Sequence, residues 1–446
     1  MTTALLTDRY ELTMIDAALG SGRADRECVF EVFGRKLPGE RRFGVVAGTG
    51  RLLDAVRDFR FGTRELEWIA EQKIVSDATL ARLADYRFTG TIEGYREGEV
   101  YVPHSPLLAV RGSFFEAVVL ETLVLSVLNY DSAVATAAAR MVLAASGRPL
   151  AEMGSRRANE NAAIAAARAA YIAGFSATSN LEAGRRWGVP TMGTAAHSFT
   201  LLHDSEEEAF RAQVEALGPG TTLLVDTYDV HQGVETAVHV AGTELGAVRL
   251  DSGDLPSLVG EVRQQLDALG ATRTRITVTN DLDEHTIAAL RGTPVDSFGV
   301  GTAVVTGSGA PAAGFVYKLV AHRGDGVDGA PGEWIPVAKT SAGKVSRGGA
   351  KRGERLVIDG VAAAEHVVID DDRDGFPDDA RAPLPAGATV RPLTTRLMTD
   401  GEPEPHWLGP EGVLAAREHC AAAVAELPRD ALRLTRGEPV IPTLVL

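Results

Sequence analysis

The chain has 446 residues, of which 45% are hydrophobic and 24% charged, a composition typical of a globular protein with roughly two or three domains. Lys and Arg number 45 against 60 Asp and Glu, and the formal net charge of −15 argues against a nucleic-acid-binding surface. The two cysteines, Cys28 and Cys420, form no Cys-x-x-Cys pair and favour neither a disulfide framework nor a thiolate metal site. We therefore expect a cytoplasmic protein in which clustered arginines hold any anionic substrate.

The N-terminus lacks the pattern of a signal peptide, because Asp8, Arg9 and Glu11 interrupt the apolar core that such a peptide requires. The most apolar run covers residues 117–128, contains Glu121 and is shorter than the about 20 apolar residues that cross a bilayer. We interpret this run as a buried helix and expect no membrane association.

The N-terminal part of the chain is predicted to begin with a helix. Asp8 and Glu11 have the spacing of a capping box ahead of apolar residues at helical spacing, and Gly20 supplies a stop signal. Residues 1–112 then mix strand-like runs such as CVFEVF with the helical segment GTRELEWIAEQ, which predicts an N-terminal α/β layer. Residues 113–149 have a helical, alanine-rich pattern that is interrupted near 129–132, and they predict a connection of two packed helices.

Residues 150–320 have a different rhythm, in which short apolar runs end in polar residues and are each followed by a helical stretch. Most of these runs recur at the spacing of a βα unit, roughly 20 to 30 residues, which predicts a parallel sheet in a closed or irregular barrel. The runs are PLAEMGSRR, GFSATSN, VPTMGTAAHS, TLLVDTYD, GAVRLDSGD, RITVTND and VDSFGVGT.

Residues 321–446 are richer in glycine, proline and acidic residues, and predict a loop-rich portion that partly rejoins the N-terminal layer. Asp370, Asp372, Asp374 and Gly375 imitate the start of a calcium loop, but Arg381 stands where the loop needs a bidentate Glu. We therefore interpret this stretch as a solvated acidic turn.

The polar residues able to carry chemistry lie at the carboxyl ends of the predicted barrel strands, where barrel and open-sheet enzymes place their sites. They combine cations for phosphate oxygens, carboxylates able to hold magnesium and a histidine among small residues. The set predicts a phosphate-handling enzyme. Its members are Arg156, Arg157, Ser179, Asn180, His197, Asp226, Asp229, Arg249, Asp251, Asn280, Asp281 and the residues Gly299, Gly301 and Thr302 of GVGT.

Each member also has a purely structural interpretation. Asn180 and Asp281 could equally cap the helices that follow them. His197 could be a core histidine bonded to the backbone, and Arg249 with Asp251, two apart on one strand, could be a structural ion pair. We favour chemistry for His197 because it shares one strand-end face with several acids and arginines, and for Arg249 and Asp251 because of their flanks, VRLDSGD.

Seven motifs occur in the order found in nicotinate phosphoribosyltransferases, and with them the chain resembles that family from residue 5 to about 320. The motifs are TDRYELTM at Thr7, GSRRANE at Gly154, FSATSN at Phe175, GTAAHSF at Gly193, VDTYD at Val225, VRLDSGD at Val248 and FGVGT at Phe298.

The resemblance implies an α/β fold, an irregular α/β barrel with a second α/β domain formed from N-terminal and C-terminal segments, as in type II phosphoribosyltransferases. It implies a homodimer with shared active sites that forms nicotinate mononucleotide and pyrophosphate from nicotinate and phosphoribosyl pyrophosphate. It also implies Mg2+ and ATP hydrolysis coupled through a phosphohistidine, which by its match to GTAAHS is His197. The sequence has no GxxxxGK[ST] loop, so ATP would use the strand-end pocket.

The resemblance also implies roles for single residues. Arg249 and Asp251 match positions that contact the phosphoribosyl group, and Asp226 with Asp251 would hold Mg2+. Tyr10 resembles the aromatic residue that stacks on the pyridine ring from the neighbouring subunit, and Arg156 the residue on its other side. The remaining substrate-binding positions are Ser179, Asn280, Gly299, Gly301 and Thr302, of which the GVGT residues would let backbone amides approach the 5-phosphate.

Ser179 favours nicotinate over nicotinamide, because nicotinamide-using relatives carry there an aspartate whose charge would repel the carboxylate of nicotinate. Quinolinate enzymes share the chemistry but are shorter chains without the GTAAHSF string. The alternatives that stay open are a nicotinamide phosphoribosyltransferase and a non-catalytic barrel that binds pyridine nucleotides.

Overall fold

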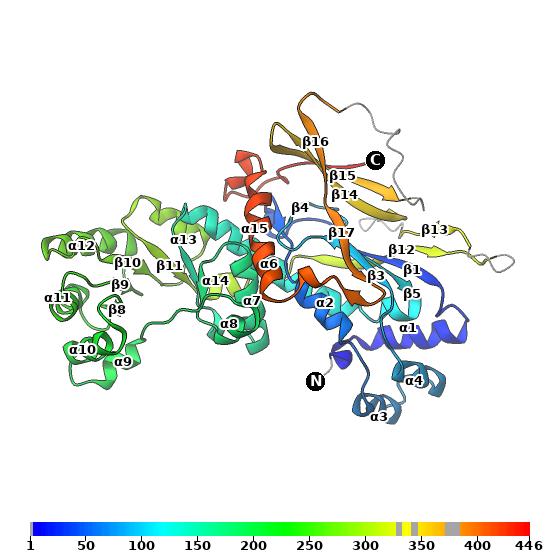
Figure 1. The fold of residues 1–446 in the computed structure, drawn as a ribbon, viewed down its shortest axis with the longest axis horizontal. Helices are drawn as coiled ribbons and strands as arrows, with labels where there is room; N and C mark the ends of the chain where they lie inside the picture. Colours follow the sequence, from blue (N-terminus) through cyan, green and yellow to red (C-terminus); the bar gives the residue numbers. More distant parts are fainter. Residues whose placement is uncertain (1–2, 327–331, 340–346, 371–383) are drawn as a thin grey trace. The chain divides into compact units, whose positions relative to one another are not determined.

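The computed structural model describes residues 3–326, 332–339, 347–370 and 384–446. The chain divides into two compact units, one made of Met1–Ala133 with Ala312–Leu446 and the other of Val134–Pro311 (Figure 1). We call them the composite unit and the barrel unit, and describe each by itself. The predicted calcium-like stretch falls mainly on residues 371–383, outside the described residues.

The composite unit is built on a seven-stranded sheet in the order β13-β12-β1-β5-β3-β17-β18. β1 pairs antiparallel with β12 from Cys28–His322 to Gly34–Phe315, so C-terminal strands continue the N-terminal sheet. The strands are β1 (Glu27–Gly34), β3 (Thr91–Tyr95), β5 (Leu108–Ser113), β12 (Phe315–Arg323), β13 (Trp334–Pro336), β17 (Thr394–Thr399) and β18 (Glu402–Pro403). The helices are α1 (Arg9–Gly20), α2 (Thr49–Arg57), α3 (Thr63–Glu71), α4 (Asp77–Ala84), α5 (Phe114–Val118) and α15 (Gly409–Ala425).

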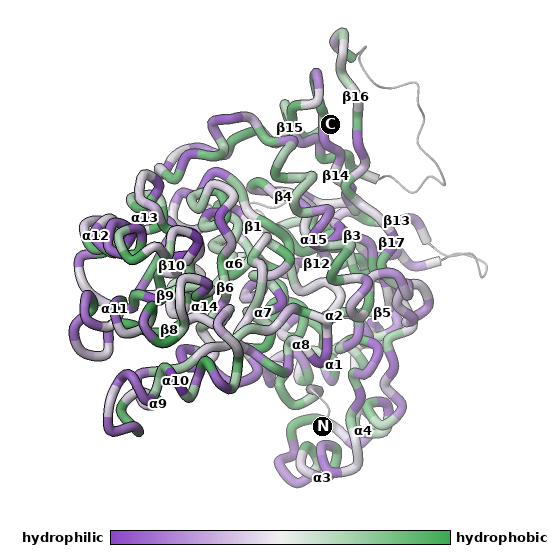
Figure 2. Tube along the Cα trace, turned by 60° about the vertical axis from the view of Figure 1, so that its left-hand side comes forward, coloured by the Kyte–Doolittle hydropathy of each residue, from purple (hydrophilic) through white to green (hydrophobic). Residues whose placement is uncertain are grey.

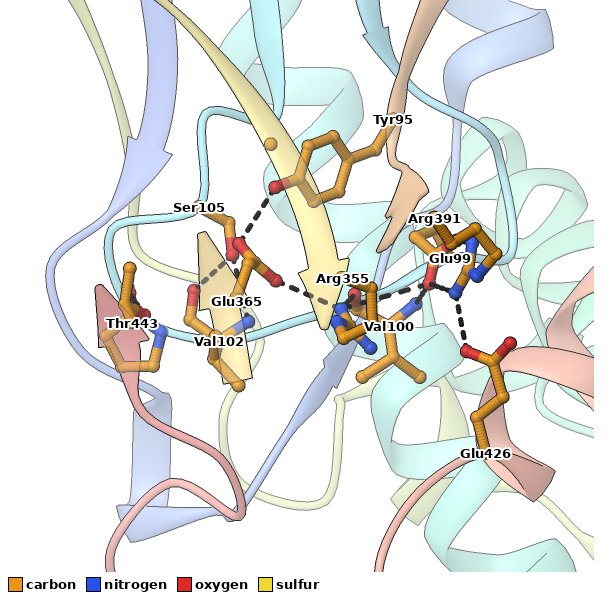
Figure 3. Close-up of polar contacts among 12 residues, drawn as sticks. Tyr95, Glu99, Val100, Val102, Ser105, Arg355, Glu365, Arg391, Glu426 and Thr443 are labelled. Carbon is orange, nitrogen blue, oxygen red and sulfur yellow. Dashed lines mark hydrogen bonds and ion pairs between the residues drawn. The ribbon is translucent and has the colours of Figure 1, made fainter. Parts of the chain in front are cut away.

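A second sheet of the composite unit has the order β16-β14-β15-β19, and a short pair joins β2 to β4. A buried polar network links this sheet to the rest of the unit: Tyr95 of β3 donates to Glu365 of β15 (2.8 Å), and Arg355 of β14 pairs with Glu365 (3.0 Å; Figure 3). The bounds are β2 (Gly44–Val45), β4 (Val100–Tyr101), β14 (Ala350–Ile358), β15 (Val361–Asp370), β16 (Ala388–Pro392) and β19 (Thr443–Val445).

The predicted helix at the start of the chain is confirmed as α1, but its predicted capping box is wrong. Asp8 occupies the N-cap position without a side-chain cap hydrogen bond. Glu11 is fully buried, and its carboxylate accepts hydrogen bonds from the hydroxyl of Thr7 and from the backbone N–H of Thr122 (3.0 Å). Burial raises the pKa of Glu11. Glu11 therefore ties α1 to the start of the long helix, a partner over a hundred residues away that spacing along the chain cannot reveal.

The predicted break near residues 129–132 is also wrong, because α6 (Glu121–Ala145) is one continuous helix. Its polar residues have partners: Asn129 donates to a backbone carbonyl (3.3 Å), Asp131 pairs with Arg51 (2.8 Å) and Ser132 accepts from a backbone N–H (3.1 Å). Among the described residues, α6 is long and apolar enough to cross a membrane by length and composition, yet 67% of its most apolar window is buried within the structure. The helix thus has the burial of a core helix.

The barrel unit contains a six-stranded parallel sheet in the order β7-β6-β11-β10-β9-β8, as the βα rhythm predicted. Figure 2 shows hydrophobic residues along β8 and β9 and hydrophilic residues on α10. The strands are β6 (Leu150–Glu152), β7 (Ala177–Thr178), β8 (Thr222–Leu224), β9 (Ala247–Leu250), β10 (Arg275–Val278) and β11 (Ser297–Val300). The helices are α7 (Glu160–Ile172), α8 (Leu181–Trp187), α9 (His197–Leu202), α10 (Glu206–Leu217), α11 (Val230–Ala241), α12 (Leu255–Ala268), α13 (Glu284–Ala289) and α14 (Thr302–Val305).

The strand predicted within VPTMGTAAHS is wrong, because only Thr191 forms an isolated parallel bridge, to Thr178. Pro190 lacks the N–H that a ladder needs and Gly193 has no side chain to pack, so pairing does not extend from this bridge. His197 begins a helix instead. β7 and β8 are the outer strands of the sheet, so the barrel is irregular and open between them.

Candidate active site

Asp226 lies just past the carboxyl end of β8, and its side chain is only 1% exposed. Its Oδ2 accepts hydrogen bonds from the backbone N–H of Asp251 (2.8 Å) and the hydroxyl of Ser252 (2.7 Å). Its Oδ1 is buried and has no hydrogen-bond partner within the described part of the chain. A buried carboxylate oxygen without a donor is costly, so this atom points to a group that arrives with substrate or cation.

Arg249 is on β9, two residues before Asp251. Its Nη1 donates to the hydroxyl of Thr194 (2.9 Å), whereas its buried Nε has no partner among the residues described. Burial lowers the pKa of Arg249 against the opposing charges of Asp251 and Asp226, and the charge of Arg156 lowers it further. Arg156 therefore lies close enough to act on Arg249, and two cations face the same strand ends.

His197 is the first residue of α9, and its side chain is 40% exposed. Its Nδ1 lies 3.1 Å from the hydroxyl of Thr227, while its Nε2 lies 3.8 Å from Asp226 and 3.9 Å from Asp251. The last two distances are too long for hydrogen bonds, so Nε2 faces two carboxylates without being bound to either. The alternative of a core histidine bonded to the backbone is wrong.

Asp251 connects the histidine side of the site to the GVGT loop. Its Oδ1 accepts a hydrogen bond from the hydroxyl of Thr279, at the end of β10. A Cβ placed on Gly299 would lie 2.6 Å from Cγ2 of the same threonine, so only glycine fits there. A Cβ on Gly301 would meet only ordinary contacts, so Gly299 is required by packing and Gly301 leaves room in front of its backbone. Thr302 begins the short helix α14.

Two of the candidate residues at the strand ends, Asn180 and Asp229, cap the helices that follow them. Asn180 caps α8 by accepting from the N–H of Ala183 (3.0 Å), and Asp229 caps α11 by accepting from the N–H of Gln232 (2.9 Å). The cap of α13 is Asp283, so the alternative that Asp281 caps this helix is wrong. Asn280 is half-buried beside it, at the end of β10.

Arg156 and Ser179 are both exposed, on the loops that follow β6 and β7. Glu152 is fully buried at the end of β6, just before the loop that carries Arg156. Sequence reasoning missed it because it ends an apolar run and has the pattern of a strand residue. Thr194, Thr227, Ser252 and Thr279 were missed as well, since hydroxyls at strand ends carry no distinctive spacing. Thr194, Thr227 and Ser252 lie inside quoted motifs, and Thr279 lies beside the candidate Asn280, so closeness to a candidate residue is the signal that could have found them.

Tyr10 lies on α1 in the composite unit, with 45% of its surface exposed. Burial of its hydroxyl and the charge and hydrogen bond of Glu121 raise the pKa of Tyr10 well above the usual phenol value. Part of the ring is thus accessible on the surface of α1.

The donors available for a cation are Asp226 and Asp251. Among the described residues no three His, Cys, Asp or Glu side chains gather as a complete metal cage. Mg2+ is usually held by one or two carboxylates together with substrate phosphates and water. Asp226, with its unpartnered Oδ1, and the nearby Asp251 would supply the carboxylates of such a site.

The comparisons with known proteins agree with this arrangement. Residues 5–129 match the nicotinate phosphoribosyltransferase (NAPRTase) N-terminal domain, and residues 134–309 match the quinolinate phosphoribosyl transferase C-terminal domain. The chain is 55% identical to nicotinate phosphoribosyltransferase pncB1 of Mycobacterium tuberculosis (strain CDC 1551 / Oshkosh), over 98% of this chain and 94% of the relative. It is 36% identical to nicotinate phosphoribosyltransferase of Bacillus subtilis (strain 168), over 79% and 73% of the two chains.

Solved structures show the same fold. Human nicotinic acid phosphoribosyltransferase superposes with a TM-score of 0.80 at 27% identity, covering 99% of this chain and 97% of the human one. Nicotinate-nucleotide pyrophosphorylase from Pyrococcus furiosus superposes with a TM-score of 0.74 at 24% identity over 95% of each chain, which supports the fold. The predicted fold class, an irregular α/β barrel with a second α/β domain, is therefore confirmed. The chain belongs to the nicotinate phosphoribosyltransferase family.

Proposed function

We propose that this enzyme transfers the phosphoribosyl group of phosphoribosyl pyrophosphate to nicotinate, forming nicotinate mononucleotide and pyrophosphate in NAD salvage. The observation that carries the proposal is the 55% identity to a nicotinate phosphoribosyltransferase over 98% of the chain. The geometry supports it, because cations, carboxylates and a histidine meet at one end of the parallel sheet.

The reaction needs charge stabilisation at two places. As the pyridine nitrogen attacks the anomeric carbon and pyrophosphate leaves, positive charge grows on the ribose ring and negative charge on the departing oxygens. Arg249 holds an unused buried Nε beside this path, and such a pre-placed donor contributes roughly 3 to 4 kcal/mol to the transition state. Asp251 faces the developing positive charge, while the GVGT backbone at Gly301 and Thr302 receives the 5-phosphate.

His197 is the proposed acceptor of phosphate from ATP. Since Nδ1 is engaged with Thr227, the free nitrogen is Nε2, which would attack the γ-phosphorus as ADP leaves. The new phosphate would carry nearly two negative charges beside Asp226 and Asp251, which places a demand for cations at this point. Mg2+, held by Asp226 and Asp251, would supply that neutralising charge when bound.

The pyridine ring is proposed to lie beside Arg156 and Ser179, with Tyr10 of a neighbouring subunit on its other face. This makes a homodimer with shared active sites part of the proposal. Asn280 is proposed to contact the substrate from the end of β10. We expect the enzyme in the cytoplasm.

The experiment that tests the function is turnover of the two pyridines by the purified enzyme, with phosphoribosyl pyrophosphate, ATP and magnesium. We expect nicotinate mononucleotide and stoichiometric pyrophosphate from nicotinate, and much slower turnover of nicotinamide because Ser179 offers no carboxylate to an amide. A preference for the amide contradicts the assignment of substrate, and no product from either pyridine contradicts the enzyme.

A further inference from the structure

Glu152 is a fully buried carboxylate at the last position of β6. Both of its oxygens are used, and they reach two different strand ends: Oε1 accepts from the backbone N–H of Gly154, and Oε2 accepts from the hydroxyl of Thr178 on β7 (2.5 Å). Its backbone carbonyl accepts from the N–H of Ser179 (2.9 Å). One residue thus binds the loop that carries Arg156 and the turn that carries Ser179.

A second pair of contacts joins the same two segments. The backbone N–H of Asn180 donates to the hydroxyl of Thr178 (3.0 Å), and the amide of Asn180 donates to the hydroxyl of Ser155 (3.0 Å). Because Thr178 already accepts from Asn180, its own proton is directed at Glu152. The separation between the two loops is therefore fixed by the hydrogen bonds of Glu152 and Thr178 together with the direct bond between Asn180 and Ser155.

The loop after β6 is also held against the end of β11. A Cβ on Gly154 would lie 2.2 Å from a methyl of Val305 and 2.9 Å from the carbonyl oxygen of Gly301. Oε1 of Glu152 lies equally close to this position, at 2.9 Å, so the loop is closely packed against all three residues and a change in the carboxylate is expected to shift the loop that carries Arg156.

The hydrogen-bond partners of Glu152 explain why a carboxylate stands at this position. Gly154 and Thr178 both present donors, and a carboxylate accepts on both oxygens. A glutamine would turn an NH2 toward one of these donors and leave it without an acceptor. Burial raises the pKa of Glu152, and the bonds from Thr178 and Gly154 oppose that effect. A residue needed only for packing would not carry a buried charge at this cost.

We propose that Glu152 is the positioning residue that sets the distance between Arg156 and Ser179, and thereby the width of the slot that admits the pyridine ring. This inference rests on the proposed function, because Arg156 and Ser179 are assigned to the ring there. Glu152 and Thr178 themselves do not contact the substrate in this proposal. Their effect is on the recognition of the ring, and the phosphoribosyl side of the site is left as it is.

The test compares Glu152→Gln, Thr178→Val and Thr178→Ser with the wild-type enzyme, with the KM for nicotinate and for phosphoribosyl pyrophosphate measured separately. Thr274→Val is the matched control, because Thr274 is also buried and lies just before β10, at the opposite end of the sheet, where its hydroxyl donates to the carbonyl of Leu245 (2.9 Å). We expect Glu152→Gln and Thr178→Val to raise the nicotinate KM roughly tenfold or more, with the KM for phosphoribosyl pyrophosphate within about twofold.

Thr178→Ser, which keeps the hydroxyl, should restore the nicotinate KM, and Thr274→Val should lower Tm without changing either KM. A nicotinate KM unchanged in Thr178→Val, or both KM values rising together, overturns the inference while leaving the proposed function intact. If Glu152→Gln does not fold, the two Thr178 variants decide alone. A wild-type enzyme that turns over no nicotinate overturns the proposed function, and this inference with it.

Discussion

Two clusters of charged residues, one in each unit, are built in opposite ways. In the composite unit Glu99 is 1% exposed and lies 2.7 Å from Arg391 and 2.8 Å from His419, and Arg355 with Glu365 forms a second close pair (Figure 3). In the barrel unit His197 stands 3.8 and 3.9 Å from two carboxylates, one of them half-exposed.

The two clusters differ in whether their charged groups are neutralised within the fold or remain open to a ligand. Burial alone would raise the pKa of Glu99, but the bonds from His419 and Arg391 outweigh it and hold the pKa at about 2. The charge of Glu99 is thus paired within the fold and contributes to its stability. Buried atoms without partners among the described residues occur in both clusters: Oδ1 of Asp226 and Nε of Arg249 at the strand ends, and nitrogens of Arg355 and Arg391 in the composite unit. What distinguishes the strand ends is access, because the side chains of His197 and Asp251 are 40% and 42% exposed, so a ligand can reach the unused groups beside them.

Arg249→Ala sharpens this contrast at the strand ends. We expect kcat/KM to fall about 100- to 1000-fold, because a pre-placed donor to the leaving oxygens is lost, while the free energy of unfolding changes by less than about 1 kcal/mol. Steady-state kinetics and urea unfolding measure the two quantities.

The matched control is Arg140→Ala in the same unit, since Arg140 is buried and pairs with Glu284 at 3.0 Å. Here we expect the reverse: a loss of roughly 3 to 5 kcal/mol of stability, with kcat/KM of the folded enzyme retained. If both variants lose activity and stability in the same proportion, the distinction between the two kinds of cluster fails.

Glu99→Gln probes the stabilising cluster through pH. The folded-state pKa of about 2 lies below the ordinary 4.5, so the ionised carboxylate contributes stability above pH 4.5 that is lost as pH falls toward 2. The wild type should lose roughly 3 kcal/mol across this window from Glu99 alone. The unfolding free energies of the two proteins, measured from about pH 6 down to about pH 2, should converge as the pH falls. Curves that stay parallel would contradict the assignment.

Ser179→Asp has a smaller expected effect. The added carboxylate should repel nicotinate and accept from the amide of nicotinamide, which shifts the ratio of kcat/KM for the two pyridines roughly tenfold toward nicotinamide. Ser176→Asp, an exposed change just before β7, is the control and should leave the ratio unchanged. An unaltered ratio in Ser179→Asp would remove Ser179 from the ring site.

Features of the site that depend on local pattern were predictable from the sequence. Short apolar runs that end in polar residues predicted the parallel strands, and the carboxyl ends of β8 and β9 bring Asp226, Arg249 and Asp251 together as expected. The roles assigned to these residues stay predictions, as do the domain boundaries at 112, 149 and 320. The strand-end convergence follows from topology alone, since parallel strands place their carboxyl ends at one edge.

Features that depend on distant partners were not predictable. α6 continues through Asn129 because that side chain bonds to the backbone of Phe315, 186 residues later. Glu11 likewise accepts a hydrogen bond from the distant Thr122 and does not cap its own helix. Glu152 has the sequence pattern of an ordinary strand residue, and only its contact with Thr178 on β7 distinguishes it. Tertiary contacts decide such cases, and local pattern does not contain them.

The most direct test of the central claim, that the strand-end residues of the barrel unit handle the phosphates, is labelling with γ-phosphate-labelled ATP and magnesium. The wild type should take up label that is lost in acid and stable in base, as phosphohistidine is. His197→Ala should take up none, whereas His203→Ala, which removes a histidine bonded to the carbonyl of Phe199 at the end of the same helix, should be labelled normally. An unlabelled wild type, or label retained in His197→Ala, would contradict the account.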